Sequence, residues 1–412
     1  MKHFPIASRA LNFLRENFVY LAPGVFLFIL PFAGTVALRL TTLAVAAIIA
    51  IFVWRNTSPP PIPCKPSIAL WILVALLSLI WALELKYSIG EIKNEIGYTM
   101  IAFLTFYGLT QGAHQWRVWN MALLLGFLAL SATATYYFPQ GWFAYSAGRH
   151  AGSGSVSTYV VLVSPLLFMA MEKSISKPAW RFPTCGLLVF GLADGYMSMN
   201  RAFWFALPIA AIAYTGLRLF RHTDRARALK LTVVVSLTML LLGGMLLFAV
   251  IGSRFSTGTS VGASLEVIAR DPRLELWGFT LRHIWSHPFI GSGFGIGSSH
   301  AVLAAQNFED PQLWHAHNTL LNYGLQLGIP GMLAALFLFF LIAWEYIILY
   351  RSDDDTCSTL GAAGLAMLAG VLCKSMTDVP IGRHNALLFW SLTGMILGYG
   401  RRIHFGGKIP AV

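Results

Sequence analysis

The residues that could do chemistry gather between residues 269 and 331, the longest interval of the chain without a clear membrane span. This interval holds five histidines and three arginines around a glycine-rich run. They are His283, His287, His300, His315, His317, Arg270, Arg273 and Arg282. Imidazole exchanges protons near neutral pH, and guanidinium binds phosphate through paired hydrogen bonds. The interval therefore predicts proton transfer combined with the binding of an anionic group.

His317 is the strongest candidate for a general base. Asn318 and Thr319 after it are typical of a helix start, and an apolar helical run over 318–330 follows. A histidine at such a helix mouth, facing a cavity, is placed to accept a proton from a hydroxyl. His315 fits an ordinary interfacial residue. A zinc site of these histidines with His300 is disfavoured, because no carboxylate or thiol lies at a useful spacing, and we expect neither metal nor cofactor.

Three arginines are candidates for binding a pyrophosphate group: Arg149, Arg201 and Arg273. All three lie on the predicted outer side, where topology does not favour positive charge. An arginine beside the hydrocarbon needs a partner, and guanidinium suits phosphate. The alternative is that each side chain simply extends to the lipid headgroups. Convergence on one outer cavity is an expectation, since the sequence does not show that the three are close.

Residues 271–285 predict an amphipathic helix that begins at Asp271 and the proline after it. Its apolar face is expected to comprise Leu274, Trp277, Leu281 and Ile284. Arg273 lies one turn before Trp277, so the indole ring could hold the guanidinium in place. The alternative is an interfacial helix whose tryptophans lie among lipid headgroups.

The glycine run begins at Gly291 and continues with glycines at 293, 295 and 297. A dinucleotide fingerprint requires glycine at the first, third and sixth places after a strand, and this run does not fit from either possible start. We interpret it as a close-packed turn that could also offer a backbone donor to an anion.

The whole chain is too apolar for a soluble domain. Hydrophobic residues make up 57% and charged residues only 11%, against about 25% charged in soluble proteins. Long apolar runs recur from end to end, which predicts an all-α polytopic membrane protein. Twelve spans are expected, at 18–34, 36–54, 67–84, 97–111, 118–137, 155–172, 184–199, 202–217, 231–251, 331–350, 359–376 and 385–400. They form a single transmembrane domain over 1–412, with a long loop at 252–317 between the ninth and tenth spans.

Charge predicts the orientation of these spans. If the N-terminus is cytoplasmic, 18 of the 29 lysines and arginines fall in cytoplasmic segments, as the positive-inside rule requires. Both termini are then cytoplasmic and the long loop faces away from the cytoplasm. The net charge of +12 is consequently assigned to loops facing anionic lipid, and nucleic acid is not an expected partner. Residues 1–17 predict a basic amphipathic segment on the membrane surface.

Three segments resemble the O-antigen ligase and polymerase superfamily of bacterial envelope enzymes, and more closely its O-antigen ligases. Met197 to Trp204 resembles the family's arginine-containing corner between spans. Arg273 to Trp277, continuing from His287 to Gly293, resembles its arginine, tryptophan, His-Pro and glycine pattern. His317 and Asn318, with Leu321, Gly328 and Gly331, resemble its His-Asn helix. Relatives often have glutamate where this chain has Gln326, so any role of that glutamate in orienting the histidine is weaker or differently filled.

The resemblance implies a metal-independent glycosyltransferase in the bacterial inner membrane, with a periplasmic active site. The donor would be a glycan on undecaprenyl pyrophosphate, and the acceptor a sugar hydroxyl of the lipid A core, giving lipopolysaccharide. His317 would be the catalytic base, and Arg149, Arg201 and Arg273 would bind the pyrophosphate. Asp378 is a weaker candidate for orienting a basic group.

The alternatives within the superfamily are an O-antigen polymerase and a protein O-oligosaccharyltransferase. A membrane transporter is the alternative from another class. It is disfavoured because neither intramembrane acids nor broken helices in paired halves are evident from the sequence.

Overall fold

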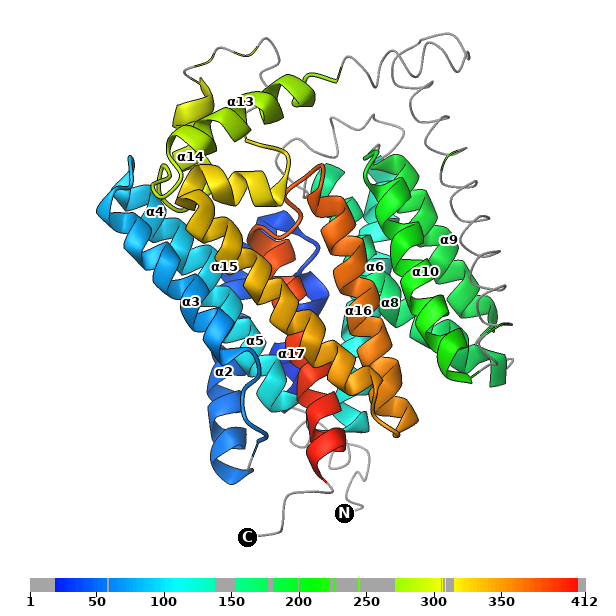
Figure 1. The fold of residues 1–412 in the computed structure, drawn as a ribbon. Coiled ribbons are helices and arrows are strands. Elements are labelled where there is room, and N and C mark those ends of the chain that lie inside the picture. Colours follow the sequence, from blue (N-terminus) through cyan, green and yellow to red (C-terminus); the bar gives the residue numbers. More distant parts are fainter. Residues whose placement is uncertain are drawn as a thin grey trace, which may run out of the picture.

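The computed structural model describes residues 19–57, 59–137, 153–176, 181–198, 200–222, 271–304 and 315–406, with a few single residues between them. Within these ranges every regular element is helical (Figure 1), which confirms the all-α prediction. The predicted amphipathic segment 1–17, nearly all of the ninth span at 231–251 and the first part of the loop 252–317, residues 252–270, lie outside the described residues.

The helices run in chain order as follows. They are α2 (Val36–Asn56), α3 (Lys65–Leu77), α4 (Leu85–Glu91), α5 (Tyr98–Leu109), α6 (Ala113–Tyr137), α8 (Ser153–Ser176), α9 (Arg181–Met197), α10 (Phe203–His222), α13 (Arg273–Ser286), α14 (Ile296–Ala304), α15 (Thr319–Tyr350), α16 (Asp355–Ser375) and α17 (Arg383–Gly406). An apolar helix at Val19–Ile29 precedes them. Short helical turns are η1 (Ala33–Thr35), η2 (Ser78–Ile80) and η3 (Ile92–Gly97).

Six of the described helices are long and apolar enough to cross a membrane. They are Val36–Asn56, Ala113–Tyr137, Gly154–Glu172, Phe203–Arg221, Thr319–Tyr350 and Asp355–Ser375. Each lies over a predicted span, which supports the prediction of a membrane protein. The apolar helices Val19–Ile29, Lys65–Ile80 and Cys185–Met197 are shorter. The count of twelve spans stays a prediction.

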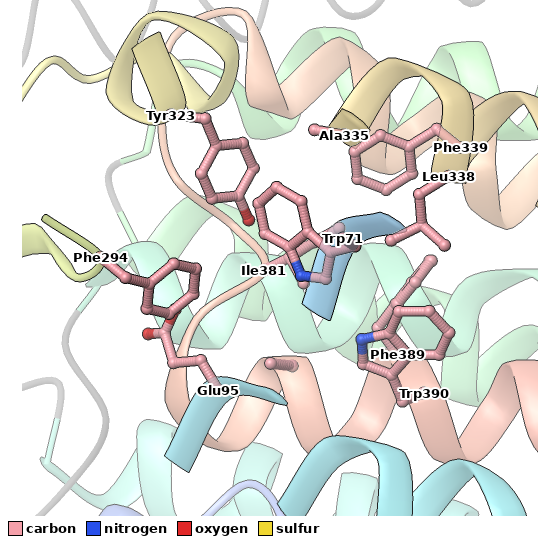
Figure 2. A pocket seen from close by; sticks show the side chains of 11 residues that line it. Trp71, Glu95, Phe294, Tyr323, Ala335, Leu338, Phe339, Ile381, Phe389 and Trp390 are labelled. Atoms are coloured by element: carbon pink, nitrogen blue, oxygen red, sulfur yellow. The ribbon is translucent and has the colours of Figure 1, made fainter. Parts of the chain in front are cut away.

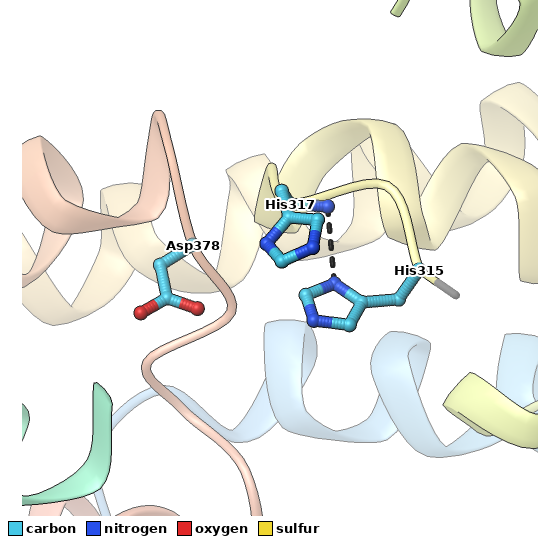
Figure 3. Close-up of side chains that lie close together, drawn as sticks. All are labelled: His315, His317 and Asp378. Atoms are coloured by element: carbon cyan, nitrogen blue, oxygen red, sulfur yellow. Dashed lines mark hydrogen bonds between the residues drawn. The ribbon is translucent and has the colours of Figure 1, made fainter. Parts of the chain in front are cut away.

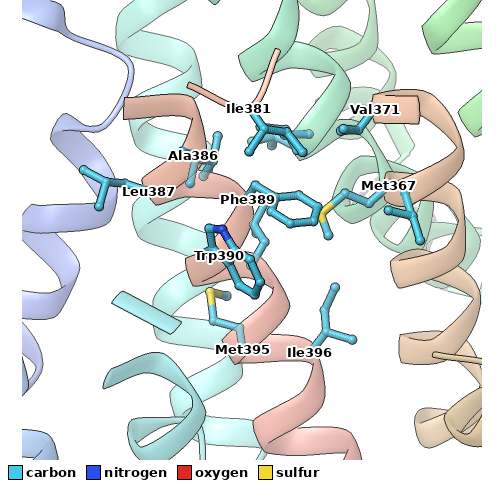
Figure 4. Packing of buried hydrophobic residues seen from close by; sticks show 14 of the residues in the cluster. Met367, Val371, Ile381, Ala386, Leu387, Phe389, Trp390, Met395 and Ile396 are labelled. Atoms are coloured by element: carbon cyan, nitrogen blue, oxygen red, sulfur yellow. The ribbon is translucent and has the colours of Figure 1, made fainter. Parts of the chain in front are cut away.

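The centre of the bundle is formed where α17 packs closely against α5. A Cβ atom on Gly394 would lie 2.4 Å from the Phe103 carbonyl oxygen, and one on Gly398 would lie 2.5 Å from that of Tyr107. Glycines four residues apart share a helix face, and their small size lets two membrane helices approach closely. On another side of α17, Phe389 extends toward α16, among the buried apolar side chains of the core (Figure 4).

One end of the bundle is rich in arginine. Arg218 on α10 contacts Glu172 of α8 at 2.6 Å and Asp355 of α16 at 2.9 Å. Arg401 on α17 pairs with Glu345 of α15. Figure 1 shows α13 and α14 at the opposite end of the bundle. The end of the bundle away from α13 therefore carries these arginine ion pairs. The end beneath α13 holds the predicted site.

Helix α15 is broken near its start. Gly328 has φ 68° and ψ −166°, which is not helical, and divides α15 into a short arm (319–327) and a long arm. Positive φ favours glycine, and a Cβ atom here would lie 2.7 Å from the Pro288 carbonyl oxygen. The same oxygen accepts the Ile329 N–H at 2.7 Å. The predicted apolar helix ahead of the tenth span is thus confirmed as the short arm.

Helix α13 lies across this end, but the predicted apolar face is partly wrong. Leu276, Thr280 and Ile284 are the buried residues of α13. Leu274 and Leu281 are each 55% exposed. Only one stripe of the helix packs on a neighbour, and the sequence pattern does not reveal which of two apolar stripes that is. The exposed stripe continues to Trp285, which is 81% exposed.

Candidate active site

His317 lies at the mouth of α15, where the sequence predicts it. Asn318 is the N-cap residue, and its Oδ1 accepts the N–H groups of Leu320 and Leu321 at 3.0 Å each. His317 itself is half-buried, with φ 47°. Left-handed backbone at a residue other than glycine costs about 1–3 kcal/mol and tends to occur at functional sites. The cap and the strained turn together fix the backbone from which the imidazole extends.

The loop after α16 brings Asp378 to His317. The Thr319 hydroxyl donates to the Asp378 carbonyl oxygen, and Asn318 Nδ2 donates to the Met376 carbonyl oxygen, both at 3.1 Å. These bonds join the first turn of α15 to a segment about sixty residues further along the chain. Ligand-capable atoms of His315, His317 and Asp378 all lie within 4.8 Å of one another (Figure 3). The structure therefore supplies the carboxylate that the sequence spacing does not reveal.

His315 is buried and supports the His317 backbone. Its Nδ1 accepts the His317 N–H at 3.0 Å, and the two rings lie 3.8 Å apart between centroids. Burial lowers the pKa of His315, and the neighbouring His317 lowers it further. His315 is therefore neutral. Because Nδ1 is the acceptor, the ring proton lies on Nε2.

A buried lysine stands behind Asp378. Lys374 is fully buried at the end of α16, and its Nζ lies 3.7 Å from Asp378 Oδ2. Burial opposes ionisation of Asp378. Lys374, the Val379 N–H and the two histidines outweigh that effect and hold the pKa of the carboxyl below its usual value. Asp378 is thus a carboxylate facing two imidazoles.

Two of the three predicted arginines are joined through one acid. Arg201, in the turn before α10, contacts Asp271 Oδ2 at 3.1 Å. Asp271 Oδ1 accepts the Arg273 N–H at 3.0 Å, which ties Arg201 to the first turn of α13. Arg273 also lies close enough to affect the charge on His315. Arg149 lies outside the described residues.

Trp277 links α13 to the histidine segment. Its Nε1 donates to the Ala316 carbonyl oxygen at 2.8 Å, next to both His315 and His317. The sequence predicts that this indole holds the Arg273 guanidinium. The hydrogen bond that the structure gives it fixes the position of α13 relative to the histidines, and the contact with the guanidinium stays a prediction. A tryptophan N–H needs a partner when buried, but the sequence does not say which one.

The glycine run is a close-packed turn, as predicted. Gly293 and Gly295 have φ of 102° and 108°, and a Cβ atom on Gly291 would lie 2.2 Å from the Gln326 backbone. The N–H groups of residues 292, 293, 294, 295 and 297 all donate within the protein. These five N–H groups are therefore not available to an anion, and a backbone donor elsewhere in the run stays a prediction.

Gln326 belongs to this turn and not to the histidine site. Its side chain is 2% exposed, and its Oε1 accepts the Gly295 N–H at 2.8 Å. Its backbone oxygen accepts the Gly293 N–H at 3.0 Å. The carboxylate beside His317 comes from Asp378. The structure thus places a different residue, Asp378, where a carboxylate could orient His317.

A small cavity lies between α3 and the segment that joins α16 to α17. Figure 2 shows Trp71, Phe294 and Tyr323 around it, with the Glu95 carboxyl at one end. Burial raises the pKa of Glu95 to about 8, so this group is protonated at neutral pH. The cavity volume is about 30 Å³, room for one or two water molecules. It is too small for a sugar, and we do not assign it to a substrate.

Two histidines and an aspartate also resemble a metal-binding set. The charge balance argues against a cation there. Asp378 already has the Lys374 ammonium beside it, and His315 Nδ1 is used by the His317 N–H. A divalent cation would lie close to an ammonium group, since both would contact the same carboxylate. We therefore interpret the cluster as a site for a proton.

Sequence reasoning missed two participants. Lys374 falls inside the predicted span 359–376, where an ionisable residue is itself a signal of function. The sequence pattern around Asp271 indicates a helix start and does not reveal its ion pair with Arg201. The expectation of no intramembrane acid is wrong as well, because Asp194 in α9 is fully buried and accepts a hydrogen bond from Ser131. Helix α15 is broken at Gly328, but one break does not test the expectation of no broken helices in paired halves.

Fold and site together define a polytopic helical membrane protein with a histidine–carboxylate pair and two arginines at one end of its bundle. Residues 186–336 match the family model described as O-Antigen ligase. The match includes Arg201, Arg273, His317 and the break in α15, and it supports membership of the O-antigen ligase superfamily. No curated protein matches the chain.

Proposed function

We propose that this protein is an O-antigen ligase. It would transfer a glycan from undecaprenyl pyrophosphate to a sugar hydroxyl of the lipid A core, as a step of lipopolysaccharide biosynthesis. The observation that carries the proposal is the pairing of His317 with Asp378 at the mouth of α15, next to the helix that bears Arg273. The family match supports a glycosyltransferase of this superfamily.

His317 acts as the general base in this mechanism. It takes the proton of the acceptor hydroxyl as the oxygen forms a bond to the anomeric carbon of the donor glycan. The bond from that carbon to the phosphate oxygen breaks, and its electron pair leaves with undecaprenyl pyrophosphate. Asp378 stabilises the imidazolium that forms, as a carboxylate does beside a catalytic histidine. A positioned base is worth about 10²–10⁴-fold in rate.

The arginines serve the leaving group. Guanidinium binds phosphate oxygens in pairs and stabilises negative charge as it develops. Asp271 contacts the Arg201 guanidinium and the backbone N–H of Arg273, so one carboxylate holds the first side chain and the helix start that carries the second. Arg149 completes the set in the proposal. Cationic side chains then fill the role that magnesium has in other phosphoryl-linked transfers, and the reaction requires no metal.

The proposed site faces the periplasm, in the inner membrane, with both termini cytoplasmic. The arginine-rich end of the bundle, with Arg218 and Arg401, would be cytoplasmic by the positive-inside rule. The site would then lie at the opposite, periplasmic end. The exposed side chains of Leu281 and Trp285 on α13 suit contact with the lipid headgroup region. Both lipid-linked substrates could approach from the membrane.

A reconstitution tests the reaction. Purified protein is mixed with a glycan on undecaprenyl pyrophosphate and with lipid A core, in excess chelator, and products are separated on a gel. We expect a new band that requires the core acceptor. Longer lipid-linked glycan without core would indicate a polymerase. Transfer to protein only would indicate an oligosaccharyltransferase, and no transfer to any acceptor would favour a transporter. Activity that appears only with added zinc or magnesium would contradict the metal-independent mechanism.

Two variants test the assigned roles. His317→Ala should abolish transfer while the protein still inserts, whereas His300→Ala, which removes an exposed histidine of α14, should leave transfer unchanged. Arg273→Ala should raise the apparent KM for the donor, and Arg282→Ala, at an exposed position of the same helix, is its matched control. Near-normal transfer by His317→Ala would remove this residue from the chemistry. An unchanged donor KM for Arg273→Ala would remove the arginine from pyrophosphate binding.

A further inference from the structure

Lys374 is a buried cation that the proposed reaction does not itself use. Its side chain has no exposed surface, and it lies in the last turn of α16. Placing an ammonium group in the interior of a membrane protein is costly, so such residues are generally paired and tied to function. Because Lys374 is fully buried, it does not reach a substrate in the site. Its effect must pass through its neighbours.

The neighbours of Lys374 connect α8 to the loop after α16. Lys374 Nζ donates to Ser157 Oγ at 2.6 Å, and the Ser157 hydroxyl donates to the Gly154 carbonyl oxygen at 3.0 Å. The directions agree, since a hydroxyl has one proton to donate and can accept another. Nζ also lies 3.7 Å from Asp378 Oδ2. The ammonium is therefore held by α8 and presented to the carboxylate.

Gly154 provides the space for this arrangement. A Cβ atom at that position would lie 3.1 Å from Asp378 Oδ2, which is a tight contact for a charged oxygen. The carboxylate thus lies against the first turn of α8, where the positive end of the helix dipole also favours negative charge. Asp378 is 22% exposed in its side chain. It joins a fully buried ammonium on one side to the half-buried His317 on the other.

A purely structural role explains this pair poorly. Removing two charges from water often costs more than their attraction returns, and an apolar pair of similar volume packs at least as well. The pair instead keeps the Asp378 carboxylate charged and holds it in one orientation. We propose that Lys374 is a positioning residue of the site: held by Ser157, it keeps Asp378 ionised and turned toward His317 without touching substrate. This inference rests on the proposed function for its kinetic consequence only.

The kinetic test is a double-mutant cycle with Lys374→Met, which keeps the length of the side chain, and Asp378→Asn. Loss of a partner that orients a metal ligand typically lowers activity about 10- to 100-fold, and we expect the same size of effect for a partner that orients a general base. We expect Lys374→Met to lower kcat by that factor, with the donor KM changed less than about twofold. In the Asp378→Asn background, Lys374→Met should change kcat by less than about twofold. A further tenfold loss in that background would overturn the proposal.

A spectroscopic test does not depend on activity. The protein is labelled with 13C at the histidine ring, and the His317 resonance is assigned by its loss in His317→Gln. Lys374→Met should shift this resonance, and the milder Ser157→Ala should shift it in the same direction. Arg401→Met removes a buried cation near the other end of the bundle and should leave it in place. An unchanged His317 resonance in a folded Lys374→Met protein would refute the positioning role.

The two tests separate the two proposals. A wild-type protein that transfers no glycan refutes the proposed function, yet the resonance comparison still decides whether Lys374 acts on His317. If Lys374→Met does not fold, Ser157→Ala keeps the question open to experiment, because it removes one hydrogen bond to the ammonium and no charge. A wild-type resonance position in Ser157→Ala, with full kcat, would count against the role of Ser157 as the anchor of Lys374.

Discussion

Asp271 contacts both Arg201 and the backbone of Arg273, so its replacement should make the start of α13 open more easily. Asp271→Ala removes the acceptor of the Arg273 N–H and the partner of Arg201. Loss of a helix-starting acceptor costs about 0.5–2 kcal/mol. The ion pair adds about 0.2–1 kcal/mol, since both side chains are partly exposed. Together they amount to about 1–3 kcal/mol for the local opening of α13.

Hydrogen exchange measures this opening directly. Since about 1.4 kcal/mol is a factor of ten, exchange of α13 amides should accelerate about 5- to 150-fold in Asp271→Ala. Asp271→Asn keeps the acceptor oxygen and loses only the charge, so its acceleration should stay below about fivefold. Peptides from α17 serve as the internal control and should exchange at the wild-type rate.

Two results would refute this reasoning. Equal, large acceleration in the Ala and Asn variants would mean that charge, and not the hydrogen bond to Arg273, holds the helix. Wild-type exchange in both would mean that packing of Leu276 and Ile284, with the Trp277 hydrogen bond, suffices without Asp271. If the reasoning holds, Asp271→Ala should also raise the donor KM more than Asp271→Asn does.

Three further predictions concern residues around the site. Gln326→Leu leaves the buried Gly295 N–H without its acceptor and should destabilise the protein by about 1–3 kcal/mol in thermal unfolding; Gln326→Glu keeps the acceptor and should cost less. Gly328→Ala should lower the melting temperature too, because a Cβ atom would lie 2.7 Å from the Pro288 carbonyl oxygen; an unchanged value would mean that the break relaxes freely. Burial lowers the pKa of His315, so below pH ~6.5 the unfolded chain binds a proton that the folded protein does not. Stability should therefore fall from pH 7 toward pH 5, and less so in His315→Gln; parallel profiles would contradict this.

Local features of the site could be predicted from the sequence, because short-range physics decides them. An asparagine just before a run of apolar residues favours a helix N-cap, and Asn318 has that role in the structure. Closely spaced glycines such as Gly293 and Gly295 predict positive φ and tight packing in the same way. The match of the long apolar helices to predicted spans has the same origin, since length and hydropathy are properties of single segments.

Contacts across the chain could not be predicted in that way. Asp378 reaches His317 only because Thr319 and Asn318 bond to the loop after α16, a pairing that no spacing in the sequence encodes. The buried stripe of α13 depends on which neighbour it meets, so Thr280 is buried while Leu281 is exposed. Lys374 carried a signal of its own, since a lysine inside an apolar span requires a partner, but the identity of that partner depends on the fold.

The break at Gly328 lets the short arm of α15 change its angle to the long arm as a rigid piece. His317 sits at one end of the short arm and the pivot at the other. Residues 319–327 number nine, so at about 1.5 Å per residue the arm is roughly 13 Å long. A rotation of about 10° at the pivot would displace the imidazole by about 2 Å, and a misplacement of about 1 Å can reduce catalysis about a hundredfold. The Pro288 carbonyl oxygen accepts the Ile329 N–H next to the pivot. This hydrogen bond therefore helps to set the position of His317 at the far end of the short arm.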